Sequence, residues 1–224
     1  MFNPKTRLFF GIGTTMPIHR ATDLIGHLPQ EKRHHYRDGY SMAEAAKCWM
    51  RAGGRLPQRV AALIGDDTLE TAHFEYGVKV WGSGRSMTDI MAVIPGDLIA
   101  VEAKARERLG SEVRDWVDQD KAKNPRSPPY RLKVGDRYAR SLGVPRNALL
   151  GLRYQLLHRT LAAPLVAKRN GRRKAWMIVQ SFAPSECDEH VRNRADFDRY
   201  VALARGTPVL EGIPVRLGWV DELI

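Results

Sequence analysis

Cysteine is scarce in this chain, with only two among 224 residues. Cys48 and Cys187 stand far apart and neither belongs to a Cys-x-x-Cys motif, so no disulfide framework is predicted. Cys187 and His190 are close in the sequence, but a structural zinc site needs about four ligands and the others are not apparent. Low cysteine content is typical of a reducing compartment, and we expect a cytoplasmic location.

Long hydrophobic runs are also missing. No stretch of about 18 consecutive apolar residues occurs, so no membrane span is predicted. The first ten residues lack the long apolar region of a secretory signal. Hydrophobic residues nevertheless make up 43% of the chain, which is enough for a core, so extended disorder is not expected. The length fits one mid-sized α/β domain with additions, or at most two small domains.

Acidic residues are almost absent from the segment 121–174. This segment has 15 Lys and Arg residues and one acid, Asp136, giving +14, whereas the rest has 21 basic and 24 acidic residues, giving −3. The net charge of +11 therefore comes from one segment. Such asymmetry favours a polyanionic partner, and we expect nucleic acid. A solvated basic face and an anionic membrane surface are the alternatives.

The sequence pattern divides the chain into three stretches within one domain. Residues 1–40 carry scattered Pro and Gly without clear periodicity and are interpreted as an N-terminal extension. Residues 41–183 carry the regular patterns of a core. Residues 184–224 are interpreted as a C-terminal helix–strand addition packed on that core.

Hydrophobic periodicity predicts the elements of the core. Ser41 and Glu44 form a capping-box pattern and open a helical region in two pieces over 41–64. Alternating and apolar runs predict three strands within 71–105, with Phe74, Tyr76, Val78 and Val80 on one face of the first. A polar, turn-rich segment follows, with at most a short helix around 110–121. Later segments are predicted as a helix over 148–163, a strand over 175–182, a helix over 196–204 and a strand over 213–220.

The second and third strands are predicted to form a hairpin around Pro95-Gly96. If these two residues form the turn, Asp89 lies opposite Glu102, with Cβ atoms roughly 5 Å apart on one face. The two-residue period of a strand puts Lys104 on the same face. A longer loop would change the register, and a shift of one residue would separate the two acids.

Two facing carboxylates among apolar neighbours repel one another and lose hydration, and a divalent cation between them relieves both problems. Mg²⁺ is commonly held by one or two carboxylates, with water and phosphate oxygens completing its shell. Such an ion can activate water and offset charge in the transition state. Lys104 would add a positive charge near the phosphate and help to orient or deprotonate the attacking water. The alternative is that Glu102 and Lys104 form an ordinary solvent-facing pair.

The motifs Ser86-Met-Thr-Asp89 and Val101-Glu-Ala-Lys104 resemble the PD-(D/E)XK signature of restriction endonuclease-like nucleases. Thr88 stands where the signature has proline, a departure that many members share. The order of predicted elements over 41–182 is also similar to the αβββαβ order of that superfamily. The segments 39–41, 153–160 and 179–182 further resemble an uncharacterised bacterial branch of it.

This resemblance implies a fold and a reaction. The fold is α/β, with a restriction endonuclease-like αβββαβ core in which helices flank a mixed central sheet, plus additions at both ends. The reaction is hydrolysis of nucleic-acid phosphodiesters, most readily DNA, with Mg²⁺ or Mn²⁺ as cofactor. Asp89 and Glu102 would be the metal ligands, and Lys104 would complete the catalytic set.

The motif Arg153-Tyr-Gln-Leu-Leu-His-Arg159 takes the place of the superfamily's second helix, which often supplies a Gln or Lys to the site. Gln155 is therefore expected at the catalytic site, and Arg153 and Arg159 at the phosphate backbone. His158 is a less favoured general base. The alternatives are a polar residue on the solvated edge of the helix for Gln155, a simply solvated side chain for one of the two arginines, and a packing or surface residue for His158.

A basic loop follows this helix and is expected to bind phosphates; it consists of Lys168, Arg169, Arg172, Arg173 and Lys174. A solvated hairpin tip is the alternative. Glu44 or Glu70 could supply an extra metal ligand. Two further functions stay open: a non-catalytic nucleic-acid-binding protein on the same fold, and an accessory subunit that binds a protein. A homodimer is compatible with the sequence, but no interface is indicated.

Overall fold

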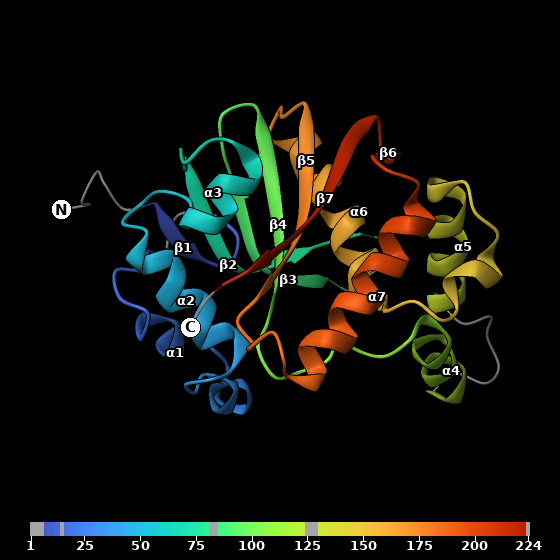
Figure 1. Cartoon of the computed structure of the whole chain (residues 1–224), viewed down its shortest axis with the longest axis horizontal. Coiled ribbons are helices and arrows are strands. Elements are labelled where there is room, and N and C mark those ends of the chain that lie inside the picture. The colour runs from blue at the N-terminus through green and yellow to red at the C-terminus, as the bar shows by residue number, and fades with distance from the viewer. Residues whose placement is uncertain (1–6, 14–15, 81–84, 124–129, 223–224) are drawn as a thin grey trace.

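A mixed sheet runs through the molecule, and within the described residues it has seven strands in the order β1-β2-β3-β4-β5-β7-β6 (Figure 1). The computed structural model describes residues 7–13, 16–80, 85–123 and 130–222. The strands are β1 Leu8–Phe10, β2 Thr71–Val78, β3 Ser86–Val93, β4 Asp97–Lys104, β5 Lys174–Ser181, β6 Val209–Leu210 and β7 Ile213–Asp221. The pairs β1–β2, β4–β5 and β5–β7 are parallel, and the others are antiparallel. The α/β class and the mixed sheet predicted from the sequence are confirmed.

Helices cover both faces of this sheet (Figure 1). One face packs on α1 Asp23–His27, α2 Ser41–Arg51 and α3 Gln58–Ile64, with the short 3₁₀ helix η1 Gln30–His35 nearby in the sequence. The other face packs on α4 Val113–Lys123, α5 Tyr130–Leu142, η2 Arg146–Leu149, α6 Tyr154–Arg169 and α7 Asp188–Ala204. Two hydrophobic cores result, one on each side, because the apolar faces of the sheet and of the helices must both leave water.

Strand β4 lies at the centre of the sheet, and all its residues after Asp97 are buried. Leu98 and Ala100 belong to the core under α6, whereas Ile99, Val101 and Ala103 belong to the core under α2. The alternation of a strand therefore directs the two polar residues that follow, Glu102 and Lys104, towards α6.

The hairpin between β3 and β4 has the predicted register. Ile90 pairs with Val101, Met91 with Ala100, and the Ile94 and Asp97 backbones exchange hydrogen bonds of 3.2 and 3.3 Å. Pro95 and Gly96 form a two-residue turn, in which Gly96 has a φ of 79°. The two-residue turn sets Asp89 and Glu102 at matching positions, so this prediction is confirmed.

Strand β2 departs from the predicted alternation. Phe74 packs in the core under α2, but Val78 and Tyr76 pack in the core under α6, so they do not share one face. The residue between them, Glu75, has φ of 51°, a left-handed conformation that is uncommon for a residue with a side chain. The prediction of one continuous face was wrong because this backbone irregularity changes the side on which the following residues lie.

Several helix boundaries also differ from the sequence predictions. The helix predicted over 148–163 is the η2 turn followed by α6, which runs through Pro164 to Arg169. Proline lacks only the N–H that would bond the Thr160 carbonyl, and burial of the residues around it keeps the helix together. Helix α7 starts at Asp188 rather than 196, and α5 was not predicted.

The two ends of the chain join the same sheet as the middle. The N-terminal extension supplies β1, and the C-terminal addition supplies α7, β6 and β7. The helical region over 41–64 comprises α2 and α3, as predicted, but Tyr40 rather than Ser41 is the N-cap. Glu44 accepts a hydrogen bond of 2.9 Å from the Gly39 amide instead. Among the described residues, no helix is long and apolar enough to cross a membrane.

A buried aspartate attaches α7 to the rest of the molecule. Asp196, 4% exposed, forms ion pairs of 2.6 Å with Arg153 at the start of α6 and of 3.0 Å with Arg108 after β4. It also contacts Arg199 of its own helix. Burial opposes the charged form of Asp196, but its bonds to Arg153 and Arg108 lower its pKa below the ordinary value.

We expect Asp196→Asn to destabilise the protein by about 2 kcal/mol, less than a fully buried pair would contribute, because its arginines are partly solvated. A lowered pKa means that this contribution is present above the unfolded-state pKa and is lost as the pH falls through the folded-state pKa. Urea unfolding between pH 7 and 3 measures it. Asp198→Asn, an exposed acid on the same helix, is the matched control, and equal losses in both variants would contradict the assignment.

Candidate functional site

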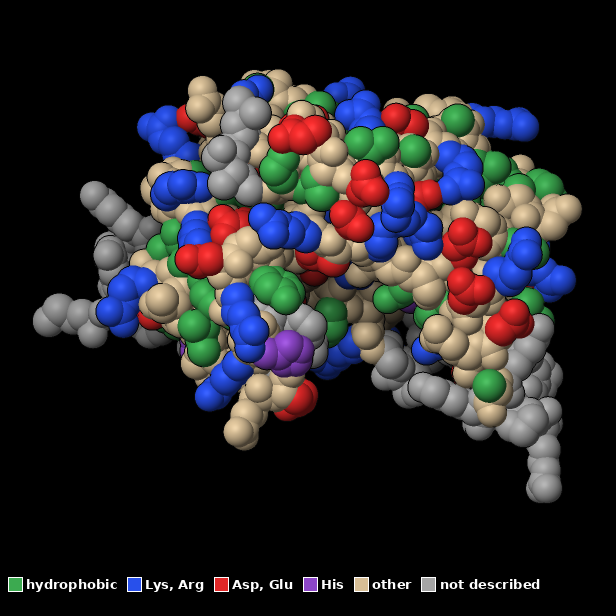
Figure 2. All heavy atoms as spheres, turned by 60° about the horizontal axis from the view of Figure 1, so that its bottom comes forward, with side chains coloured by type: hydrophobic (Ala, Val, Ile, Leu, Met, Phe, Trp, Pro, Cys, Tyr) green, Lys and Arg blue, Asp and Glu red, His purple; other side chains and the backbone are tan. Residues whose placement is uncertain are grey.

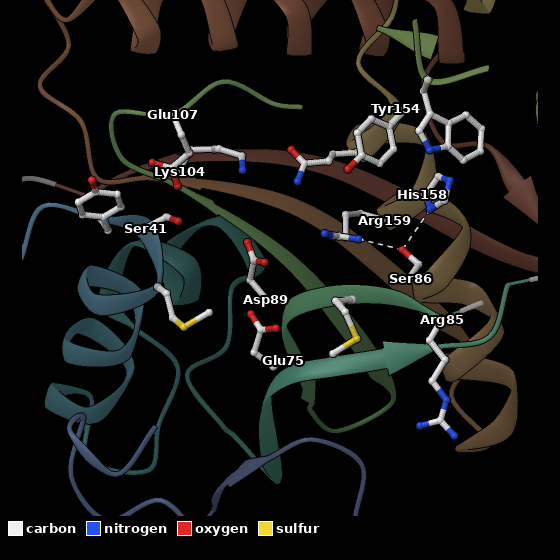
Figure 3. A pocket seen from close by; sticks show the side chains of 15 residues that line it. Ser41, Glu75, Arg85, Ser86, Asp89, Lys104, Glu107, Tyr154, His158 and Arg159 are labelled. Carbon is white, nitrogen blue, oxygen red and sulfur yellow. Dashed lines mark hydrogen bonds between the residues drawn. The ribbon is translucent and has the colours of Figure 1, made fainter. Parts of the chain in front are cut away.

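A pocket of about 690 Å³ opens at the carboxyl end of β4, between the first turns of α2 and α6 (Figure 3). Asp89 of β3, Lys104 of β4 and Gln155 and Arg159 of α6 line it. Glu102 lies behind this wall and has no exposed surface. The structure thus brings the predicted catalytic residues into one region, although 66 residues separate Asp89 from Gln155.

Glu102 is held between two cations. Its Oε2 accepts a hydrogen bond of 2.5 Å from Arg159 Nε, and Lys104 Nζ lies 2.8 Å from its Oε1. Each oxygen of the Glu102 carboxylate is therefore paired with a cation. Burial alone would raise the pKa of Glu102, but Arg159 and then Lys104 lower it, so this carboxylate is ionised.

Asp89 borders the pocket in a different electrostatic setting. Its Oδ2 accepts a hydrogen bond of 2.8 Å from the Ala103 amide, which replaces strand pairing at this point. Burial, and then the neighbouring charge of Glu102, raise the pKa of Asp89 to about 8, although Arg159 and Lys104 act to lower it. The two predicted metal ligands therefore differ, since one carboxylate is neutralised by cations and the other is not.

A third carboxylate was missed from the sequence. Glu75 of β2 lines the same pocket, is 8% exposed and lies next to Asp89 in Figure 3. Its charge contributes to the raised pKa of Asp89. No pattern points to Glu75 because its place depends on the left-handed backbone at that residue. The acids suggested as extra ligands lie elsewhere: Glu44 at the start of α2, and Glu70 bound to Arg172.

Arg159 is buried, so the prediction that it contacts the phosphate backbone at the surface was wrong. It is 5% exposed, and its Nη1 donates a 3.0 Å hydrogen bond to Ser86 Oγ in addition to its bond with Glu102. Ser86 Oγ also lies 3.1 Å from His158 Nδ1 (Figure 3). The Ser86 hydroxyl accepts the Arg159 hydrogen bond and also bonds to His158, as donor or acceptor according to the histidine tautomer. Ser86 thus ties β3 to Arg159 and His158 of α6, beside the ion pair of Glu102 and Arg159. No sequence pattern indicated this role.

His158 is unsuited to the role of general base. Its ring packs against Trp116, Tyr138 and Tyr154, with centroid distances between 5.0 and 5.5 Å. Burial, and then the charge of Arg159, lower its pKa to about 3. The imidazole therefore stays neutral at physiological pH and forms part of an aromatic wall of the pocket.

Gln155 lies where the sequence predicted, at the pocket, and its buried Oε1 has no hydrogen-bond partner among the described residues. Gly110 packs against it: a Cβ at that glycine would lie 2.6 Å from Tyr154 Cε1 and 3.2 Å from Gln155 Oε1. A φ of 65° independently favours glycine there. Arg153, the other arginine of this motif, is bound to Asp196 and does not line the pocket.

The basic loop lies at the opposite end of the sheet from the pocket. Lys174 pairs with Asp97 at the start of β4, whereas Lys104 pairs with Ser181 at its end. Seven steps of about 3.3 Å make this separation roughly 23 Å along the strand. Arg172 is bound to Glu70. Residues 124–129 of the basic segment lie outside the described part.

Positive charge does not gather in one patch over the face that Figure 2 shows. In that view, Lys and Arg side chains are interspersed with Asp and Glu. The basic segment of the sequence is divided among α5, α6, the loop before β5 and the interior. The pocket and the basic loop are therefore two separate features.

The raised pKa of Asp89 predicts how the stability of the fold changes with pH. Between about pH 4 and 8 the folded chain holds a proton on Asp89 that the unfolded chain releases, so stability falls as the pH rises through this range. Asp89→Asn keeps an oxygen for the Ala103 amide and removes the charge. We expect it to stabilise the metal-free protein at pH 8 by roughly 1–3 kcal/mol and to flatten this fall.

Chemical unfolding in EDTA from pH 4 to 8 checks this result. Asp198→Asn removes an exposed acid and should leave the pH profile unchanged. An Asp89→Asn protein that is less stable than wild type at pH 8 would mean that the ionised carboxylate is well solvated or well paired.

Comparison with known proteins identifies the family of the chain but does not identify an activity. No curated protein and no solved structure matches the chain. A family model described as a domain of unknown function, DUF6946, matches residues 17–223. The match takes in nearly the whole chain, including every residue of the pocket described above, and the chain therefore belongs to the DUF6946 family.

Proposed function

We propose that the chain is a nuclease of the PD-(D/E)XK type that hydrolyses nucleic-acid phosphodiester bonds, most readily DNA, with Mg²⁺ or Mn²⁺. One observation carries the proposal. Asp89, Glu102 and Lys104 meet at one end of the sheet, where Asp89 and Lys104 line the pocket and Glu102 lies directly behind it, 2.8 Å from Lys104. The order of α2–α3, β2, β3, β4, α6 and β5 supports it, since it follows the αβββαβ order that the sequence motifs suggested, with α4, α5 and η2 inserted between β4 and α6.

The oxygen donors are of the kind that a hard divalent cation takes, but Glu102 would have to exchange Lys104 for the ion, because it lies behind the pocket wall with its oxygens on Lys104 and Arg159. As they stand, no three Asp, Glu, His or Cys side chains of the described residues are grouped to hold a metal. Mg²⁺ needs fewer, because one or two carboxylates with water and phosphate oxygens suffice. Asp89 and Glu102 would hold it, and the raised pKa of Asp89 reflects a carboxylate that lacks sufficient positive charge. When bound, the ion would supply an activated water and charge stabilisation for the phosphoryl group.

The chain's own residues would position the reactants. In the reaction, a water oxygen bonds to phosphorus and the bond to the leaving ester oxygen breaks. Lys104 Nζ, at the pocket wall, would place a positive charge beside the phosphate oxygens. Arg159 keeps Glu102 ionised and fixed in direction. The partnerless Oε1 of Gln155 is suited to accept a hydrogen bond from the attacking water.

A non-catalytic nucleic-acid-binding protein is the second candidate. The observation in its favour is that Arg159 and Lys104 already neutralise Glu102, so no cation is required for that carboxylate to be buried. Such a protein would bind nucleic acid whether or not Glu102 is ionisable. The two candidates therefore differ in their response to substitutions at the pocket.

We expect Lys104→Met to lower cleavage at least 100-fold, because the methionine keeps the volume and loses the charge that faces the phosphate. Glu102→Gln should lower it similarly. The assay incubates plasmid, linear duplex and single-stranded DNA with Mg²⁺, Mn²⁺ or EDTA. Glu186→Gln, an exposed acid outside the pocket, and Lys133→Met, an exposed lysine on α5, are the matched controls. Cleavage at equal rates by wild type and both pocket variants would refute the proposal.

The basic loop would contribute affinity rather than catalysis. Lys168 and Arg169 are exposed, and each phosphate contact that they make would release counterions. We expect the double change Lys168→Gln and Arg169→Gln to weaken DNA binding and to reduce the slope of log K against log salt by about 1–2. The rate at saturating DNA should stay within about twofold, since the loop is remote from the pocket.

Fluorescence anisotropy over a salt series, together with the saturated rate, measures both effects. Arg51→Gln with Arg59→Gln removes the same charge from exposed positions at α2 and α3. If this control reduces the salt slope as much as the loop variant, the contribution is that of net charge and not of the loop.

A further inference from the structure

A second pocket adjoins the one described above. It has a volume of about 390 Å³ and shares Glu75, Arg85 and Met87 with the larger pocket. Its size falls within the roughly 300–1,000 Å³ of small-molecule sites. Because three residues border both spaces, a chain-like ligand can occupy the two pockets with consecutive parts.

The walls of the second pocket are largely apolar and aromatic. Phe10 of β1 and His27 of α1 stack with their ring centroids 5.3 Å apart and an angle of 25° between their planes. Leu28 is buried behind them, and Ile12 is 48% exposed at the rim. These residues come from the N-terminal part of the chain, and no sequence pattern linked that part to the site.

Gly77 of β2 lines the second pocket beneath two of the residues that border both pockets. A Cβ at this position would lie 3.1 Å from Arg85 Cδ and 3.3 Å from Met87 Sδ, so both side chains lie directly over the bare backbone. A larger residue would displace them into the shared space. The glycine is thus required by the close approach of the side chains that border both pockets.

Arg85 supplies a cation at this junction. It is exposed, and Figure 3 shows its guanidinium directed away from Asp89 and Lys104. A guanidinium binds phosphate oxygens with two parallel hydrogen bonds. An apolar recess with a cation at its entrance, next to a site for phosphodiester chemistry, matches one nucleotide: a base in the recess and its phosphate at Arg85.

We infer that the second pocket binds one unpaired nucleobase of the substrate strand, so that the chain acts on single-stranded nucleic acid or on an unpaired end. This inference rests on the proposed function. A base inside a duplex is stacked on both faces and hydrogen-bonded along its edge, so it enters a recess only when it leaves the helix. Stacking on aromatic walls is the usual way in which proteins hold unpaired bases.

The test uses a single-stranded DNA 12-mer with 2-aminopurine, a base whose fluorescence falls on stacking, and the same strand in a duplex, both in EDTA. Ile12→Glu puts a negative charge at the exposed rim of the recess, and Phe10→Leu removes the stacking ring while keeping bulk. We expect each to weaken single-strand binding about tenfold or more and to reduce the quenching. Duplex binding should change less than threefold.

Val209→Glu, an equally drastic change at a position 64% exposed on β6, is the matched control and should bind like wild type. Equal losses with Val209→Glu, or binding of single strand and duplex that responds identically to Ile12→Glu, would overturn the inference. So would a wild-type chain that does not bind the single strand.

A parallel cleavage assay with Mg²⁺ separates the two proposals. Cleavage that is normal in Ile12→Glu and Phe10→Leu would leave the nuclease in place and remove the base pocket. Base quenching that depends on Ile12 and Phe10, without cleavage in any metal, would retain the pocket and refute the nuclease.

Discussion

The buried charge of Glu102 determines how β4 and α6 are placed relative to one another. Moving an ionised carboxylate out of water costs several kcal/mol, which must be offset by close partners of opposite charge. Lys104 comes from the same strand, but Arg159 must come from α6, so the first turns of this helix are held against the end of β4. Apolar residues could fill the same volume with equal or greater stability. An ion triad in the middle of an otherwise apolar sheet is therefore better explained by a function than by folding.

The two acids Glu102 and Asp89 differ in how closely positive charges surround them. Arg159 and Lys104 lie against Glu102, whereas the pKa of Asp89 is raised by burial and by the charge of Glu102. Because the two acids interact strongly, they titrate as a pair, and a positive charge placed between them would act on both. A cation near Asp89 would also free Lys104 to face a phosphate. Under the proposed function, Lys104 would contact Glu102 when no substrate is bound and a phosphate when it is. Only a small movement of the Lys104 side chain would be needed.

Short-range patterns predicted the parts of the site that lie within one hairpin. Pro95-Gly96 determines the register, and the register determines that Asp89 and Glu102 share a face. The partner of Glu102 was not predictable, because Arg159 is 57 residues away and its sequence neighbours look like a solvated helix edge. Glu75 was missed because its position follows from one left-handed backbone angle. The basic segment does not form one surface: folding buries Arg159 and places Lys168 at the opposite end of the sheet from the pocket.

The irregular part of β2 connects these observations. Glu75, with its left-handed backbone, and Gly77, with no side chain, stand two residues apart on the strand that separates the two pockets. In a regular strand Tyr76 and Val78 would continue the face begun at Phe74, whereas here they pack in the opposite core. Left-handed backbone at a residue such as Glu75 costs of order 1–3 kcal/mol and is commonly found at functional sites. The left-handed residue brings a third acid to Asp89, and the bare backbone of Gly77 lets Arg85 and Met87, which border both pockets, lie over β2.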